Sequence, residues 1–179
     1  GAAAPPAAAR SSASASKEEQ ILSALRKMEQ ERTVVLEEKR KESLLAGVLI
    51  TEETDYVPAK IRHAGSTIKV KLRLKGDWTD HLDGEKWSFR VQVKGDNHLF
   101  GMRRFSFQSP QTRGYDAEIL FFEALKREGI LTPRYFFVNL TVNGKKMGIM
   151  ALEEHFSKEL LESQNRREGV ILKFDESLI

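Results

Sequence analysis

Alternation of apolar and polar residues dominates the middle of the chain. Residues 68–75, IKVKLRLK, place apolar side chains on one face of a strand and basic side chains on the other. Residues 86–94, KWSFRVQVK, alternate in the same way, and residues 100–109, FGMRRFSFQS, follow as a third segment. A period of two residues is typical of half-buried strands. We therefore expect three strands here, the first two of them antiparallel partners.

The period becomes helical after this region. Residues 115–128 predict a helix, which ends at a glycine, a common residue just beyond a helix. The Asn-Gly pair at 143–144 lies between two apolar runs and predicts a tight hairpin between two further strands. A short helix is expected within 155–167 and a last strand within 169–174.

The first part of the chain has a different character. Residues 1–16 are small, contain proline and have low complexity, so we expect a disordered linker or a remnant of cloning. Residues 17–46 predict one long helix whose apolar residues follow near-heptad spacing until Arg32 and Lys39 interrupt it. Two interpretations stay open: a charged helix packed on its own domain, or a dimerising or juxtamembrane stalk that follows a membrane anchor.

This order of elements predicts an α+β fold. It consists of a twisted antiparallel sheet of about five strands with one packed helix, preceded by the long N-terminal helix. We expect this domain to cover residues 56–179. The same order occurs in the N-terminal lobe of protein kinases, where a polar loop joins the first two strands, although order alone is an analogy of fold.

Composition narrows the functional classes. The 179 residues include 29 basic and 26 acidic side chains, a net charge of +3, which is too balanced to indicate nucleic-acid binding. Cysteine is absent, which excludes disulfides and thiolate sites. There is no run of about 18 apolar residues, so no membrane-spanning helix is expected. No Gly-rich loop ending in Gly-Lys-Ser/Thr occurs, which excludes a P-loop nucleotide site.

Five short motifs, taken in order, resemble the CotH kinase-like family (spore coat protein H and its relatives). They read KGD at 75–77, KWSFR at 86–90, YD at 115–116, NG at 143–144 and GIMALEE at 148–154. Lys75 stands where the family usually has arginine, and the Arg-Asn pair common in the family's helix is absent from AEILFFEALKREG. The resemblance covers roughly residues 68–176.

The resemblance implies a kinase-like fold that binds ATP with Mg²⁺ and transfers phosphate to a protein. It implies that the catalytic and metal-binding residues lie in a C-terminal lobe beyond residue 179, so no catalytic or metal-binding residue is expected here and this chain alone should be inactive. It also favours an exported or membrane-attached setting in the cell envelope, with a protein substrate or an envelope partner.

Several charged residues are candidates for contact with the nucleotide. Glu118 falls within the apolar sector of the predicted helix, where a carboxylate needs a cationic partner or a proton. Kinase-like proteins use such a glutamate to hold the phosphate-binding lysine. Lys86 is the lysine that we expect Glu118 to hold, and Arg104 is the alternative cation. The other interpretation is a purely structural ion pair of Glu118 with Arg104 or Arg113. The full candidate set is Lys86, Glu118, Arg90, Arg104, Lys75, Asp77 and Glu153.

The acidic loop GDWTDHLDGE, residues 76–85, raises the question of a metal site. Its aspartates recur at every third position, whereas an EF-hand loop places ligands at alternate positions and glycine at the sixth. His63, His98 and His155 have no companions at ligand spacing and are expected at the surface. We therefore expect a loop that closes over a ligand rather than a metal loop.

A second function remains open from sequence alone. The domain could be a non-catalytic binding or scaffold module that keeps the fold without the chemistry. The basic strand face from Lys69 to Lys75 would then hold a protein or an anionic polysaccharide.

Overall fold

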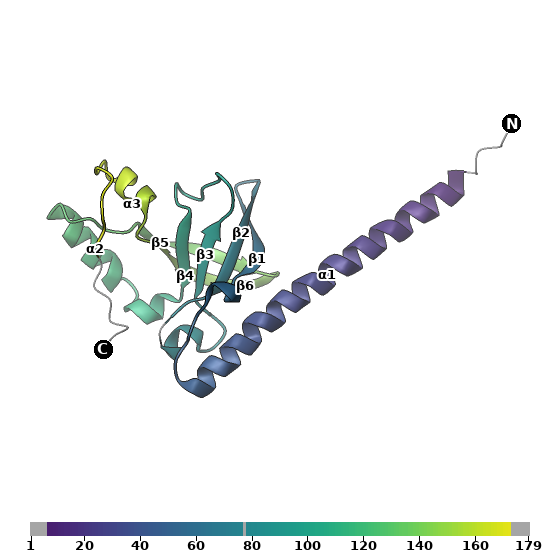
Figure 1. The fold of residues 1–179 in the computed structure, drawn as a ribbon, viewed down its shortest axis with the longest axis horizontal. Coiled ribbons are helices and arrows are strands. Elements are labelled where there is room, and N and C mark those ends of the chain that lie inside the picture. The colour runs from purple at the N-terminus through teal and green to yellow at the C-terminus, as the bar shows by residue number, and fades with distance from the viewer. Residues whose placement is uncertain (1–6, 77, 173–179) are drawn as a thin grey trace. The chain divides into compact units, whose positions relative to one another are not determined.

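A computed structural model describes residues 7–76 and 78–172 of the chain (Figure 1). The chain divides into two compact units, residues 1–39 and 40–179. The first unit consists of the greater part of helix α1 (Ala7–Ala46). The sequence predicts this helix from residue 17, whereas the structure begins it ten residues earlier, because the alanine-rich stretch before that point has high helix propensity. Residues 1–6 of the predicted linker lie outside the described part.

The second unit is built on one antiparallel sheet of six strands in the order β1-β2-β3-β4-β6-β5. The strands are β1 (Val57–His63), β2 (Ser66–Leu74), β3 (Phe89–Val93), β4 (Arg104–Gln108), β5 (Tyr135–Val142) and β6 (Lys145–Glu154). The predicted α+β fold, with its long N-terminal helix, is confirmed. The additional strand is β1, which contains Pro58 and pairs along its length with β2 at the edge of the sheet, where proline is tolerated.

One face of the sheet forms the apolar core. Val70, Val91, Phe105, Met150 and Leu152 are each at most 1% exposed and belong to one cluster that spans β2, β3, β4 and β6. Because successive side chains of a strand alternate between faces, the basic and polar residues of the same strands lie together on the opposite face. The alternation that predicts the strands therefore also produces one polar face of the sheet.

Short helices connect and flank the strands. They are η1 (Glu53–Asp55), η2 (Thr79–Leu82), η3 (Pro110–Arg113), α2 (Ala117–Arg127) and α3 (Lys158–Ser163). Both helices predicted after the third strand are confirmed. Helix α2 packs against β5 (Figure 1). The Phe122 and Tyr135 rings lie 5.8 Å apart. Only part of its apolar sector is covered, since Leu120 and Phe121 are 69% and 56% exposed.

The two predictions for the end of the domain have different outcomes. The Asn-Gly hairpin is confirmed: it joins β5 to β6, and Asn143 and Gly144 both have positive φ angles, as a tight hairpin turn requires. The strand predicted within 169–174 is wrong for its described part, 169–172. Val170 and Leu172 are 89% and 91% exposed, and no strand of the described residues pairs with them.

Among the residues that the structure describes, no helix has the length and apolar character needed to cross a membrane.

Candidate functional site

The polar face of the sheet carries a row of side chains across five strands. The pairing register aligns Arg73 with Arg90, Arg90 with Ser106, Ser106 with Glu153, and Glu153 with Tyr135. These five residues belong to β2, β3, β4, β6 and β5 in turn. Neighbouring strands lie about 4.8 Å apart, so the row brings together charges that are far apart in the sequence. We call the face around this row the polar face.

Lys75, directly after β2, forms the centre of an ion pair on this face. Its Nζ donates to Glu153 Oε2 at 2.6 Å and to Gln108 Oε1 at 2.6 Å. The side chains of Lys75 and Glu153 are only 11% and 19% exposed, and Gln108 is fully buried. The ammonium group is therefore fixed by two acceptors from β6 and β4.

Burial and charge act on the two partners in different ways. Burial lowers the pKa of Lys75, because the charged form loses hydration, and the carboxylate of Glu153 opposes this shift without reversing it. Burial alone would raise the pKa of Glu153, but the charge and hydrogen bond of Lys75, together with the charges of Arg113 and Arg90, outweigh it, and that pKa falls below its usual value. Glu153 is thus ionised at neutral pH and holds the lysine in place.

Glu118 of α2 faces this ion pair without joining it. It is half-buried, and burial raises its pKa. The positive charges of Arg113 and Lys75 oppose the shift, whereas the charge of Glu153 reinforces it. Glu118 forms no ion pair with any described residue, so neither the predicted partnership with Lys86 nor the alternative pairing with Arg104 or Arg113 is formed.

Lys86 and Arg104 occupy more exposed positions. Lys86 Nζ donates to the carbonyl oxygen of Ile149 at 3.3 Å. Ile149 precedes Glu153 by four residues on β6, a separation of about 13 Å along the strand. Arg104 is exposed on β4, opposite Gln92. The structure therefore brings Lys75 rather than Lys86 to the carboxylates of the polar face.

Hydrogen bonds of Ser88, in the KWSFR motif, hold the loop that precedes β3. Ser88 is fully buried, and its Oγ lies 2.9 Å from Nδ1 of His81, while its backbone N–H donates to the His81 carbonyl. The Lys75 N–H donates to the Ser88 carbonyl at 2.9 Å, which continues the β2–β3 ladder. Gly76 has φ +131° and lies directly against the His81 ring. Glycine and serine in these motifs thus fix the loop beside Lys75.

The loop shows no metal site within its described part. Among described residues, no group of three or more His, Asp or Glu side chains is placed to hold a metal ion. Asp77, a predicted nucleotide contact, lies outside the described residues. His81 is buried, and its Nδ1 lies 2.9 Å from Ser88 Oγ, while Asp80 and Asp83 are exposed.

His81 should make the stability of the domain dependent on pH. Burial lowers its pKa, and the nearby charge of Lys75 lowers it further. In the unfolded chain His81 takes up a proton below about pH 6.5, whereas the folded chain resists protonation, so unfolding becomes easier as pH falls. Urea denaturation should give a free energy of unfolding that decreases from pH 7 to pH 5. His81→Gln should lose this part of the slope, and an unchanged slope would contradict the assignment.

Glu154 has a structural role at the end of β6. Its side chain has no exposed surface and is held by Arg134 through Nε at 2.8 Å and Nη2 at 2.5 Å, which ties the end of β6 to the segment before β5.

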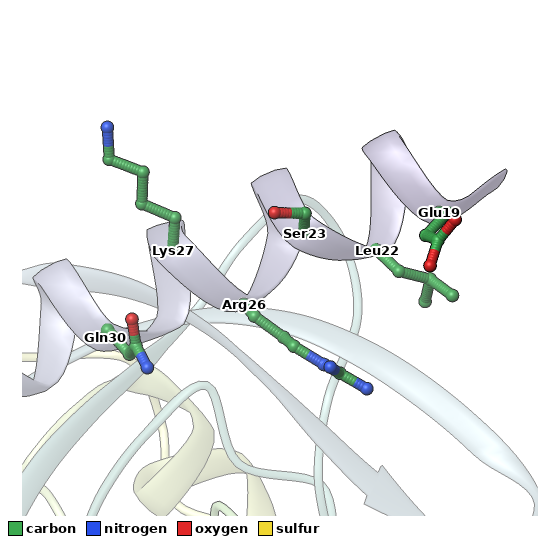
Figure 2. A pocket seen from close by; sticks show the side chains of 6 residues that line it. All are labelled: Glu19, Leu22, Ser23, Arg26, Lys27 and Gln30. Carbon is green, nitrogen blue, oxygen red and sulfur yellow. The ribbon is translucent and has the colours of Figure 1, made fainter. Parts of the chain in front are cut away.

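Helix α1 carries a shallow surface on one of its sides, shown in Figure 2. It is lined only by side chains of that helix: Glu19, Leu22, Ser23, Arg26, Lys27 and Gln30.

Sequence reasoning named Lys75 and Glu153 but did not join them. It missed Gln108 and placed His155 at the surface, whereas His155 is half-buried with Nδ1 2.6 Å from Arg90 Nη1. The period of two does place Arg73 and Lys75 on one face. The register of β4 with β6, which brings Glu153 to that face, has no local signal in the sequence.

Comparison with known proteins agrees with this architecture. The family model described as CotH kinase protein matches residues 72–178, which begin in β2 and include every element from the acidic loop onward. No match was found among curated proteins. Because the matched region covers more than half of the 179 residues, the chain belongs to the CotH kinase family.

Proposed function

We propose that this chain is the nucleotide-binding lobe of a CotH-family protein kinase, and that its polar face holds the phosphates of ATP beside Lys75. The observation that carries the proposal is the nearly buried Lys75 ammonium, fixed by Glu153 and Gln108 on a face rich in basic residues. A lysine held by a glutamate in this way is a device by which kinases present a positive charge to nucleotide phosphates.

The residues present fit the phosphates better than they fit the metal. Lys75 supplies a point charge suited to phosphate oxygens. Glu118 lies close enough for its pKa to respond to Lys75, so it would orient the lysine once a nucleotide draws the ammonium from Glu153. For Mg²⁺ the described residues offer no cluster of ligands.

The remaining parts of the activity would come from outside the described residues. In this proposal, a C-terminal lobe supplies the acidic residues that bind Mg²⁺ and the base that accepts the proton of a protein substrate. The chain alone would bind nucleotide without transferring phosphate. An exported or membrane-attached location, with a protein partner in the cell envelope, belongs to the same proposal.

Nucleotide binding by matched lysine variants tests this function. Lys75→Met should weaken ATP binding, measured by calorimetry, at least tenfold, because a hydrogen bond between charged groups contributes about 1.5–3 kcal/mol. Lys86→Met removes the same basic side chain from the next motif, KWSFR, and should change the affinity less than threefold, since Lys86 is exposed. Equal affinity of all three proteins, or no ATP binding by the parent chain, would refute the proposal.

A further inference from the structure

Three arginines gather on the polar face beside the lysine site. Arg73 and Arg90 are directly opposed in the β2–β3 register. Arg104 lies on the next strand, opposite Gln92, which is two residues beyond Arg90 and on the same face. Side chains directly opposite one another on antiparallel strands have Cβ atoms about 5 Å apart, and like charges there are destabilising. The cluster therefore needs a compensating negative charge.

The described residues do not provide that charge in full. The Arg90 side chain is half-buried, and its Nη1 lies 2.6 Å from His155 Nδ1, which is not a carboxylate. Its Nε is buried and has no hydrogen-bond partner among the described residues. Glu153 is the carboxylate that acts on Arg90, but its Oε2 is engaged by Lys75. A buried donor of a charged group without an acceptor is costly and calls for an explanation.

Tyr56 lies beside the arginine cluster. The Tyr56 ring lies 4.5 Å from Lys71 Nζ and 5.4 Å from the Arg73 guanidinium carbon, and its hydroxyl accepts a hydrogen bond from Gln92 at 2.8 Å. Lys71 is further tied to Glu53 at 3.1 Å. Tyr56 thus orients Arg73, while Lys71 has its own carboxylate. Arg73, Arg90 and Arg104 form no ion pair with any described residue.

We propose that Arg73, Arg90 and Arg104 form a binding site for a phosphate group, separate from the ion-paired Lys75. A planar guanidinium offers parallel donors that match two oxygens of a tetrahedral oxyanion. Arg73 and Arg104 both lie near enough to Arg90 for their charges to act on it. The phosphate belongs either to the nucleotide of the proposed function, on which this part of the inference then rests, or to a separate phosphate-bearing ligand. The shared chemistry is a multiply charged phosphate oxyanion.

Calorimetric titration of the whole chain with pyrophosphate, inorganic phosphate and ATP tests the site. We expect the parent protein to bind pyrophosphate and Arg90→Gln to weaken that binding at least tenfold. Arg104→Gln, an exposed position on the same face, should weaken it as well. Arg62→Gln, which removes an exposed arginine of β1, is the matched control and should leave binding unchanged. If Arg90→Gln does not fold, as judged by circular dichroism, Arg104→Gln decides the question.

The arms of the experiment separate this site from the proposed function. If neither pyrophosphate nor phosphate binds, or if the arginine variants bind them as the parent does, the site is refuted. Loss of ATP binding in Lys75→Met, with ATP and pyrophosphate binding unchanged in both arginine variants, would retain the nucleotide lobe and refute the arginine site. Pyrophosphate binding that depends on Arg90 or Arg104, in a chain that does not bind ATP, would retain the arginine site and refute the nucleotide lobe.

Discussion

Replacement of Gly76 by alanine is expected to lower the melting temperature of the domain by about 10 °C, which corresponds to about 3 kcal/mol for a domain of this size. A Cβ atom at this position would lie 2.5 Å from the His81 Cβ and 2.7 Å from two of its ring carbons. The φ angle of +131° is also one that only glycine adopts without strain. The ring cannot give way freely, because it is buried and hydrogen-bonded to Ser88.

Gly65→Ala is the matched control for this prediction. Gly65 lies in the β1–β2 turn with φ +78°, and an added Cβ there would meet no atom within 4 Å. Its cost should be limited to the left-handed backbone, about 1 kcal/mol. Thermal unfolding followed by circular dichroism measures both variants. A loss for Gly76→Ala no greater than that for Gly65→Ala would show that contact with His81 does not hold the loop in place.

The strands were predictable where their alternation was strong. IKVKLRLK and KWSFRVQVK each carry four apolar residues at alternate positions, and both contain paired strands whose apolar residues lie on the core face; Trp87 lies just before β3 and is only half-buried. The strand β1 was missed because VPAKIRH contains proline and alternates weakly, so its pairing with β2 decides its conformation. The run GVILKF shows the converse: apolar and β-branched residues predict a strand, but the described part of it has no partner.

The site was predictable as a set of residues but not as an arrangement. The candidate set contains both members of the ion pair, yet 78 positions separate Lys75 from Glu153. Their contact depends on β6 lying beside β4, a neighbour relation that no local pattern records. The helical period places Glu118 beside apolar residues, and its side chain is half-buried, but the predicted ion pair with a cation of the sheet is not formed. The helical period does not predict which lysine, Lys75 or Lys86, lies near Glu118, because that depends on how the acidic loop folds.

A double-mutant cycle on Lys75 and Glu153 should separate their structural role from their role in binding. Lys75→Met leaves Glu153 with an uncompensated charge, and Glu153→Leu does the same to Lys75. Since each side chain is mostly buried, each single variant should lose about 3 kcal/mol of unfolding free energy in urea denaturation. The double variant removes both charges and replaces them with apolar groups of similar size, so its stability should return to within about 1 kcal/mol of the parent.

The binding behaviour of the double variant gives the decisive result. A chain that regains stability but still fails to bind ATP requires the lysine for the nucleotide itself, because its fold no longer needs the pair. A double variant that is stable and binds ATP as the parent does would assign the pair to the fold alone and leave the phosphates to the arginines of β2, β3 and β4. Burial of this ion pair costs free energy, because both charges lose hydration. Under the proposed function, a bound nucleotide would take over one of the two partners.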